Sequence, residues 1–304
     1  MRLLVVTARY PTPDRPAAGA FVRDRLRDPE VQVRLAAPRR YDGSRLLRFL
    51  RVSWTALTAR GRFDGVEGHF VLPTGPVALL AARLRGIPLV LYAHGGDVRD
   101  GPRRSAVHRW LAARAVRGAD AVVTNSADTA ALVAALGATA EVVPPGIDLV
   151  RFSPLPRPER RTVLYLGGAV AHKGAEVGQQ LADTAVGPGL REVDPAEVPG
   201  LISAHDVVLV PSRAEPFGLV AAEAIASGRW VVAAATGGLP EIVSDGVNGT
   251  LVTDGDYEAA LAGVPDYDPD AVAASAERFG LDRHWAGMKS VWERVLARRQ
   301  GTRA

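Results

Sequence analysis

The sequence predicts an α/β protein with two doubly wound domains, each a parallel sheet covered by helices. Short apolar runs of strand length alternate with helical patterns along most of the chain, which is typical of parallel strands joined by crossover helices. Several runs are apolar throughout, as burial on both faces of a parallel sheet requires. The length of 304 residues suits two such domains facing each other across a cleft.

Five runs in the first half are expected as strands, and four more follow in the second half. The Pro-rich stretch 153–158 between the two series cannot be a helix interior and is expected as an interdomain linker. The expected strands are Leu3–Thr7, Val31–Ala36, Pro88–Ala93, Ala121–Thr124, Glu141–Val143, Thr162–Leu166, Asp206–Val210, Trp230–Ala233 and Thr250–Val252.

The composition excludes several classes of site. There are 37 Lys and Arg against 33 Asp and Glu, a net charge of +4, and this small excess does not indicate a nucleic-acid partner. The chain has no cysteine, so disulfides, thiolate-bound metals and thiol nucleophiles are excluded. No apolar run approaches 18 residues and the first residues lack a signal-peptide layout, so we expect a soluble cytoplasmic protein.

The most informative segment follows the strand expected at 206–210. Residues 211–219 form a loop that contains Glu215 and opens a small-residue helix carrying Glu223. Free amides and the helix dipole at that terminus favour an anion such as a diphosphate, and carboxylates accept hydrogen bonds from sugar hydroxyls. Alternatively, Glu215 caps the helix and Glu223 is a solvated helical residue. The segment alone does not decide between these interpretations.

A second segment suits phosphate contact. Residues 165–174 run from a strand through a glycine-rich turn to Lys173 before a helix. The spacing is not that of a Walker A loop. Lys173 can be an ordinary surface lysine, but it is one of only two lysines in an arginine-dominated chain. That rarity argues for a required ammonium group.

Together these residues resemble a known family. Glu215 to Glu223 matches the E-x7-E motif of retaining glycosyltransferases with the GT-B fold, and Glu-Pro-Phe-Gly-Leu is the form typical of glycosyltransferase family 4. The resemblance extends from Leu3 to about Trp292. Further blocks in the family's order are the loop 10–22 with Gly19, His94–Asp97, Pro144–Asp148, His172–Gly174 and Gly237–Glu241.

The resemblance implies the GT-B architecture of two Rossmann-like domains. An acceptor domain would span residues 1–150 and be completed by a C-terminal helix at 283–304, while residues 151–282 would form the nucleotide-sugar domain. An apolar stripe near the C-terminus is expected to be core in that helix and just before it. Its members are Phe279, Trp285, Met288, Val291, Trp292 and Val295.

The resemblance also assigns roles in donor binding. Glu215 would bind sugar hydroxyls and act in catalysis, Glu223 would bind the ribose, and Lys173 would neutralise the diphosphate. The amides around Phe217, Gly218 and Leu219 would hold the sugar and diphosphate.

Two residues of the first domain complete the implied site. Gly19 would let its loop approach donor and acceptor closely, because glycine lacks a Cβ. His94 would sit beside the transferring sugar as a catalytic residue. A lone histidine is more often structural, but His-Gly-Gly-Asp at a strand terminus favours a site role.

The implied reaction retains the anomeric configuration and transfers a hexosyl or related sugar to an acceptor hydroxyl of a small molecule or glycan. Natural-product or cell-envelope glycosides are the expected products. The base of the donor, UDP, GDP or dTDP, stays open, and we expect no metal and no cofactor beyond the donor. The pairs Asp254/Asp256 and Asp268/Asp270 look like D-x-D metal motifs, but we interpret them as turn and cap residues.

Two departures from the family pattern support an alternative function. Gly168 stands where the family commonly has an arginine that binds diphosphate, and residues 177–201 leave room for little more than a helix and one turn. The alternative is a non-catalytic nucleotide-sugar-binding or accessory protein. An NAD-dependent dehydrogenase is disfavoured, since neither half opens with G-x-G-x-x-G.

Residues 44–60 predict an amphipathic helix in the first domain. Leu46, Leu50, Trp54 and Leu57 lie on one side, and residues 39–62 contain seven Arg and one Asp. Such a helix can lie on an anionic membrane or face an acidic acceptor. A helix that covers the first sheet with its arginines in water is the favoured interpretation, so peripheral membrane contact is possible but not favoured.

Overall fold

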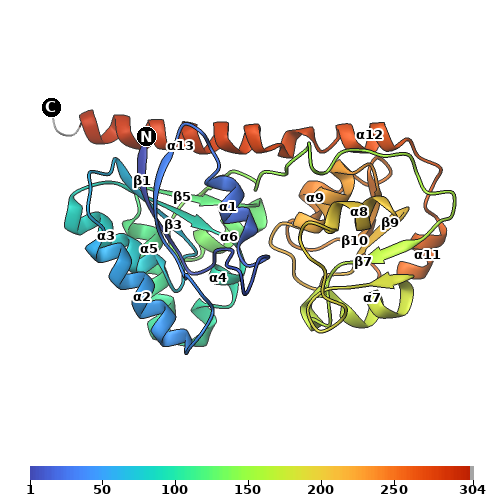
Figure 1. Ribbon diagram of the computed structural model, residues 1–304, viewed down its shortest axis with the longest axis horizontal. Helices are drawn as coiled ribbons and strands as arrows, with labels where there is room; N and C mark the ends of the chain where they lie inside the picture. Colours follow the sequence, from blue (N-terminus) through green and yellow to red (C-terminus); the bar gives the residue numbers. More distant parts are fainter. Residues whose placement is uncertain (302–304) are drawn as a thin grey trace. The chain divides into compact units, whose positions relative to one another are not determined.

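The computed structural model describes residues 1–301 and divides into two compact units. Unit 1 comprises Met1–Gly146 and the chain from His284 onward, and unit 2 comprises Ile147–Arg283. Each unit has one wholly parallel sheet with helices packed around it (Figure 1). The predicted class, two doubly wound α/β domains, is confirmed. No helix in residues 1–301 is long and apolar enough to cross a membrane.

Unit 1 contains a six-stranded sheet in the order β2-β1-β3-β4-β5-β6. Its strands are β1 (Arg2–Thr7), β2 (Gln32–Ala36), β3 (Gly65–His69), β4 (Leu89–Ala93), β5 (Ala121–Thr124) and β6 (Glu141–Val142). Its helices are α1 (Ala20–Arg25), α2 (Arg45–Thr58), α3 (Gly75–Arg85), α4 (Gly96–Arg99), η1 (Pro102–Arg104), α5 (Ala106–Gly118), α6 (Ala127–Ala134) and most of α13 (Leu281–Gly301).

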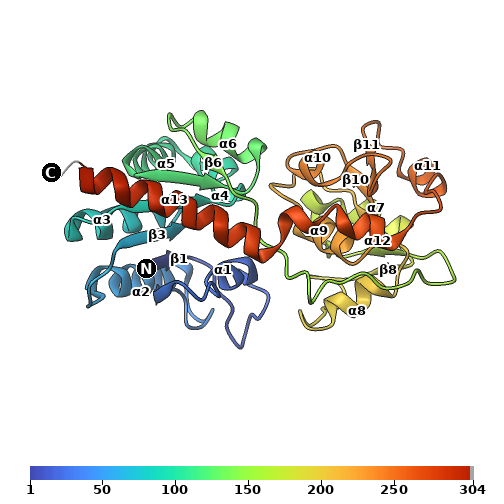
Figure 2. The same ribbon diagram turned by 90° about the horizontal axis from the view of Figure 1, so that it is seen from above.

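Alternate residues along β1 face different helices. Leu4 and Val6 pack in one cluster with side chains of α2 and α3. Leu3 and Val5 pack in another with the α13 residues Met288, Val291, Trp292 and Val295. The sheet is therefore buried on both faces, with α13 lying across one of them (Figure 2). This explains why the strand reads as a continuous apolar run.

Helix α2 covers the sheet as expected, but with a different side from the one that the sequence predicts. The side chains that it buries are the small residues Val52 and Ala56, whereas Leu46, Leu50 and Trp54 are exposed. The helix does cover the sheet, and Leu57 at its end packs against the same cluster, but Leu46, Leu50 and Trp54 point away from it.

Strand β3 lies in the middle of the sheet and is absent from the sequence prediction. Its sequence, Gly-Val-Glu-Gly-His, has two glycines and two titratable residues, so it lacks the apolar character that indicates a buried strand. All five residues are nevertheless buried. A Cβ at Gly65 would lie 2.3 Å from the Trp292 ring, so the glycine leaves room for α13.

Unit 2 contains a five-stranded sheet in the order β11-β10-β9-β7-β8. Its strands are β7 (Val163–Tyr165), β8 (Thr184–Ala185), β9 (Val207–Val210), β10 (Trp230–Ala234) and β11 (Gly249–Val252). Its helices are η2 (Ala171–Lys173), α7 (Ala175–Leu181), α8 (Val198–Ser203), α9 (Leu219–Ala226), α10 (Leu239–Ile242), α11 (Tyr257–Ala262), α12 (Pro269–Ala274) and η3 (Glu277–Phe279).

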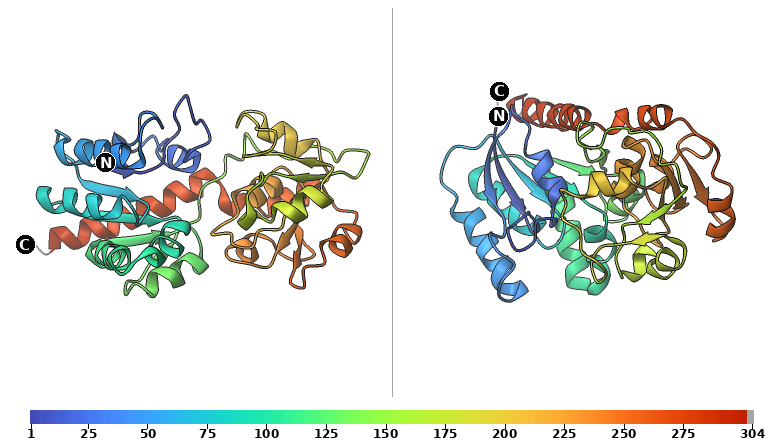
Figure 3. Two further views of the ribbon diagram at one scale, coloured as in Figure 1. Left: turned by 90° about the horizontal axis from the view of Figure 1, so that it is seen from below. Right: turned by 45° about the vertical axis from the view of Figure 1, so that its right-hand side comes forward.

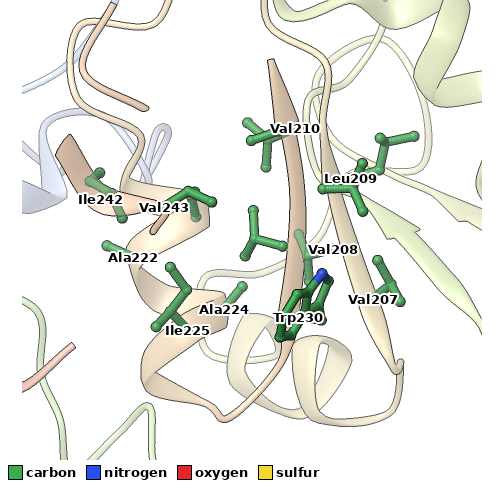
Figure 4. Packing of buried hydrophobic residues seen from close by; sticks show 14 of the residues in the cluster. Val207, Val208, Leu209, Val210, Ala222, Ala224, Ile225, Trp230, Ile242 and Val243 are labelled. Carbon is green, nitrogen blue, oxygen red and sulfur yellow. The ribbon is translucent and has the colours of Figure 1, made fainter. Parts of the chain in front are cut away.

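The core of unit 2 forms where α9 packs on the central strands. Ala222, Ala224 and Ile225 of α9 lie on the side of β9 from which Val208 and Val210 project (Figure 4). Small residues on the helix allow its backbone to approach the sheet closely. The loops at the ends of β9 and α9 are therefore fixed by a well-packed core.

The Pro-rich stretch 153–158 is not a linker between the units. It belongs to unit 2, where the fully buried Arg229 donates hydrogen bonds to the carbonyl oxygens of Leu155 and Pro156 at 2.9 Å. Arg157 pairs with the buried Asp206, with an N–O distance of 2.9 Å. Proline does exclude helix here, but two arginines hold the segment against the unit 2 core.

We expect Trp292→Ala to destabilise unit 1 by about 3–5 kcal/mol, because it empties the space beneath β3 that a buried indole fills. Denaturant unfolding followed by circular dichroism measures the loss. Trp54→Ala is the matched control, since that indole is exposed and its removal should change stability by less than about 0.5 kcal/mol. Equal effects in the two variants would contradict the packing of α13.

Candidate active site

The predicted donor residues of unit 2 gather where its strand order reverses. The chain passes from β7 outward to β8, then returns to β9 on the other side of β7. In such sheets, ligands bind beyond the carboxyl ends of the two strands that flank this switch point. The loop after β7 carries Lys173, and the loop after β9 carries Glu215.

Lys173 and Glu215 form an ion pair. The Lys173 Nζ lies 2.6 Å from Glu215 Oε2, and Ser212 Oγ donates to the same oxygen at 3.1 Å. The Glu215 side chain is 9% exposed and that of Lys173 is 34% exposed. An ammonium has three donors, so Lys173 can keep its contact with Glu215 and still donate to a phosphate oxygen.

Two glycines outside the motif fix the loop of Glu215. The amide of Gly238 donates to the Glu215 carbonyl oxygen at 2.8 Å. A Cβ at Gly237, where φ is +57°, would lie 2.0 Å from that oxygen. The Gly-Gly pair before α10 is therefore needed for the backbone of the carboxylate loop to pack at all.

The Phe-Gly-Leu segment begins α9. Gly218 precedes the helix with a φ of +112°, a conformation that side chains rarely adopt. The Phe217 ring is buried edge-on against Phe279, with 5.7 Å between centroids, so only its backbone can contact a ligand. Leu219 and Glu223 are half-buried, and their i, i+4 spacing places them on one face of the helix.

Gly168 packs against a turn of the shortened segment. Gly168 has a φ of +65°, and a Cβ there would lie 2.4 Å from the Pro188 carbonyl oxygen. Its amide donates to Val186, and the next amide donates to Pro188. The segment contains most of α7, this turn and the start of α8, and it also holds β8, a two-residue strand that the sequence analysis did not predict. The turn packs directly on Gly168, so a side chain there has no space.

Neither Arg213 nor Arg9, the two arginines that could replace a side chain missing at Gly168, is held there by contacts within unit 2. Arg213 donates from an exposed position to Glu176 at 2.8 Å. Arg9 lies in unit 1, with its guanidinium 5.9 Å from the centre of the Phe70 ring. Lys173 is thus the cation that the contacts of unit 2 place beside Glu215.

The switch point of unit 1 lies between β1 and β3. The Gly19 loop follows β1, and His94 follows β4, the neighbour of β3 on its other side. Gly19 precedes α1 with a φ of +71°, and a Cβ there would lie 2.6 Å from the Arg9 carbonyl oxygen. The loop after β1 can fold back only because this residue is glycine. Phe21 then lies 4.7 Å from the His94 ring, centroid to centroid. The structure therefore brings the Gly19 loop and His94 together.

His94 follows β4 and is enclosed by aromatic rings. Its ring stacks on Tyr92 at 4.6 Å between centroids and lies 4.6 Å from Phe70. Its amide donates to Asp97 Oδ1 at 2.9 Å, which explains the Asp in the His-Gly-Gly-Asp block. Burial holds the pKa of His94 well below its ordinary value, so the imidazole is neutral at pH 7.

A buried carboxylate behind His94 escaped the sequence analysis. Glu67 Oε2 accepts from Arg25 at 3.0 Å and from the Trp292 indole at 2.9 Å, while Glu67 Oε1 lies 3.1 Å from His69 Nε2. Burial alone would raise the pKa of Glu67, but Arg25 and the His69 hydrogen bond hold it far below its ordinary value. Glu67 is therefore a buried, ionised carboxylate.

The hydrogen bonds assign the protons of the two histidines. Ionised Glu67 only accepts, so His69 Nε2 carries a proton, and in a neutral His69 ring Nδ1 is then an acceptor. His69 Nδ1 lies 3.0 Å from His94 Nε2, which must then be the protonated nitrogen of the neutral ring. The Nδ1 atom of His94 is left as its acceptor.

The backbone is strained next to His69, at the end of β3. Phe70, directly after β3, has a φ of +73°, which is uncommon for a bulky residue and is often found at functional sites. One signal in the sequence points to the missed His69: like His94, it stands where a buried strand ends and a turn begins. This signal can be recognised only if β3 is first predicted as a strand, and the polar composition of β3 prevents that prediction.

The D-x-D pairs have the structural roles expected of them. Asp256 caps α11 by accepting from Ala259, and Asp268 caps α12 by accepting from Asp270. Asp254 accepts from the amide of Asp256 at 3.0 Å. In residues 1–301, no three His, Asp or Glu side chains are grouped so as to hold a metal ion.

Comparisons with known proteins identify the family and the fold of the chain. Residues 1–146 match the family described as a glycosyl transferase 4-like domain, and residues 190–267 match glycosyl transferases group 1. A D-inositol 3-phosphate glycosyltransferase 1 of Catenulispora acidiphila is 33% identical over 86% of this chain and 78% of its own length. That of Geodermatophilus obscurus is 34% identical over 78% of this chain, which spans 65% of that relative.

Solved structures share the fold at low sequence identity. HepE of Anabaena, crystallised with UDP, superposes with a TM-score of 0.71 at 18% identity, covering 96% of this chain and 100% of its own. Sucrose-phosphate synthase of Thermosynechococcus elongatus gives a TM-score of 0.70 at 19% identity, covering 97% of this chain and 99% of its own.

We expect Gly168→Arg to destabilise unit 2 rather than improve the site, because the turn at Pro188 occupies the space of a side chain. Gly255→Arg is the control, since Gly255 has a φ of +85° but open space around it. Strain at positive φ costs on the order of 1 kcal/mol in both variants, and the clash adds to it only at Gly168. Thermal unfolding that falls equally in both would contradict the packing of the turn.

Acidification should destabilise unit 1 through His284. Burial lowers the pKa of His284 to about 4, and its Nδ1 donates to the Pro144 carbonyl oxygen at 2.6 Å. The unfolded chain binds this proton near pH 6.5, so stability is present above that pH and falls toward pH 4 by on the order of 3 kcal/mol.

Unfolding measured at pH 7 and pH 4.5 tests this, with His284→Gln expected to show a shallower loss. The control is His172→Gln, which changes an exposed histidine. A His284→Gln variant as pH-sensitive as the unmodified chain would refute the assignment.

Proposed function

Because the chain belongs to glycosyltransferase family 4 of the GT-B fold, we propose that it is a retaining enzyme that transfers a hexosyl or related sugar from a nucleotide diphosphate to an acceptor hydroxyl. The observation that carries this proposal is the Lys173–Glu215 pair, 2.6 Å apart at the switch point of unit 2. A cation for the diphosphate and a carboxylate for sugar hydroxyls stand together there, beside the start of α9.

The proposed mechanism depends on positioning and electrostatics. Lys173 and the first amides of α9 would stabilise the charge that develops on the leaving diphosphate. Glu215 would orient the sugar through its hydroxyls, and Glu223 would bind the ribose. His94, neutral and fixed in one tautomer, would accept a hydrogen bond from the sugar through Nδ1. None of these roles requires a metal, so activity should persist in a chelator.

The relatives suggest which substrates to test first. HepE has been crystallised with UDP and with UDP-glucose, which favours a uridine nucleotide donor, with GDP and dTDP sugars as alternatives. The matched relatives are named for D-inositol 3-phosphate, which adds a phosphorylated cyclitol to the small-molecule and glycan acceptors. Natural-product or cell-envelope glycosides are the proposed products, made in the cytoplasm.

A non-catalytic nucleotide-sugar-binding or accessory protein is the second candidate. The turn on Gly168 favours it, because that turn leaves no room for the arginine that would share the diphosphate with Lys173. The intact Lys173–Glu215 pair and the ordered His94 favour the enzyme. Donor hydrolysis or transfer discriminates between the two candidates.

A thermal-shift screen with UDP, GDP, dTDP, ADP and their sugar conjugates tests the donor site. A ligand that binds only the folded protein raises its melting temperature. We expect one nucleotide class to give the largest shift, and its sugar conjugates would then be used to search for the acceptor. No shift with any of them at millimolar concentration would reject donor binding and the proposed enzyme with it.

Two substitutions should separate binding from transfer. Glu223→Ala should weaken nucleotide binding about tenfold or more, as the loss of a charged hydrogen bond predicts. His94→Ala should slow turnover about a hundredfold with a smaller effect on donor affinity. The controls are Glu258→Ala and His108→Ala, which remove side chains of the same types outside the motif blocks. Equal, negligible effects of both site substitutions would contradict the assigned roles.

A further inference from the structure

Three neighbouring helices form one outer surface of unit 1. Helices α2 and α3 pack against each other, as do α3 and α5, and Figure 3 (left) shows the three side by side over one face of the sheet. The opposite face is covered by α13. We call the exposed side of these three helices the outer face.

The outer face carries large apolar side chains that have no core to fill. On α2, Leu46 is 65% exposed, Leu50 is 51% exposed and Trp54 is 71% exposed. Their i, i+4 spacing aligns them along the helix, while the small residues Val52 and Ala56 face the sheet. The amphipathic helix is thus turned with its larger hydrophobic side outward.

The same feature recurs on the two neighbouring helices. In residues 1–301, eight of the twelve exposed large hydrophobic side chains lie on these three elements. Such a concentration on adjacent helices exceeds the scattered exposure usual for a surface. The eight are Leu46, Leu47, Leu50 and Trp54 of α2, Leu80 and Leu84 of α3, and Val107 and Trp110 of α5.

The charges of these helices all have one sign. Helices α2, α3 and α5 contain eight arginines and no Asp or Glu. Removing these eight from the 37 basic residues leaves 29 against 33 acidic ones, so the rest of the chain has a net charge of −4. The positive charge of the protein is therefore concentrated around the exposed apolar residues.

Four of these arginines are available to a partner. Arg45, Arg83, Arg109 and Arg114 are exposed and make no ion pair within residues 1–301. The remaining four contact the protein itself, as when Arg85 donates to three carbonyl oxygens around the end of α2. The outer face thus combines exposed apolar residues with free guanidinium groups.

We propose that the outer face docks the protein on an anionic lipid bilayer. Apolar side chains can enter the boundary between headgroups and acyl chains while long arginines reach phosphate groups. The two exposed indoles, Trp54 and Trp110, suit this interface because they have an apolar body and a polar N–H. A second copy docking through the same face would oppose arginine with arginine, which disfavours a dimer.

Vesicle co-sedimentation of the full chain tests this proposal and needs no nucleotide sugar, so its result is independent of the proposed function. We expect binding to phosphatidylcholine vesicles that contain phosphatidylglycerol and much weaker binding to phosphatidylcholine alone. High salt should reduce binding, since screening weakens attraction to the headgroups. The tryptophan emission should shift to the blue as Trp54 and Trp110 leave water.

The variant Leu50→Ser/Trp54→Ser/Trp110→Ser should bind the anionic vesicles at least about tenfold more weakly. Val150→Ser/Val247→Ser is the control, because it removes two exposed apolar residues of unit 2 and should bind as the unmodified chain does. Circular dichroism confirms that both variants are folded.

Three results would overturn the proposal. They are no binding of the unmodified chain to anionic vesicles, equal binding of the triple variant, and self-association through the outer face in place of lipid binding. Conservative substitution to Leu50→Met/Trp54→Phe/Trp110→Phe should retain most of the binding, and this separates lost hydrophobicity from a disturbed fold.

Discussion

The ionised carboxylate of Glu67 is the interaction on which unit 1 depends. Its two oxygens meet groups from α1, from β3 and from α13, namely Arg25, His69 and the Trp292 indole. A buried charge is tolerated only when its hydrogen bonds are satisfied. The sheet, the first helix and the last helix must therefore assemble together for this carboxylate to be stable. The same assembly fixes His69, and through it the proton on His94, so core stability and site geometry share one set of contacts.

Unit 2 obtains its geometry in a different way, through close backbone contacts. Glycines at 168, 218 and 237 all have positive φ, and a Cβ at 168 or 237 would lie within 2.4 Å of a carbonyl oxygen. The loops that carry Lys173 and Glu215 thus pack as backbone on backbone. Here the site depends on missing side chains, whereas in unit 1 it depends on a charged one.

This difference explains how much the sequence could predict. Apolar strands depend on local patterns, and those predictions agree with the structure. The same holds for the placement of Glu215 in the loop after β9 and of Glu223 in α9. The role of Glu67 depends on partners 42 and 225 positions away, which no local pattern contains. Strand β3 was not predicted because Glu67, the carboxylate that stabilises the unit, lies within it and gives its sequence a polar character. The orientation of α2 could not be predicted either. Apolar residues lie on two sides of this helix, and the sequence pattern does not say which side packs on the sheet.

The two sides of the unit 1 sheet differ in where acidic residues occur. On the α13 side, a carboxylate is buried where three donors satisfy it. On the α2, α3 and α5 side, Asp and Glu are absent from the helices and arginines stand in water beside Leu and Trp. An acidic residue there would pair with those guanidinium groups and neutralise the surface. Its absence keeps the arginines available, so the same sheet can support a closed charged network on one side and an open cationic, apolar surface on the other.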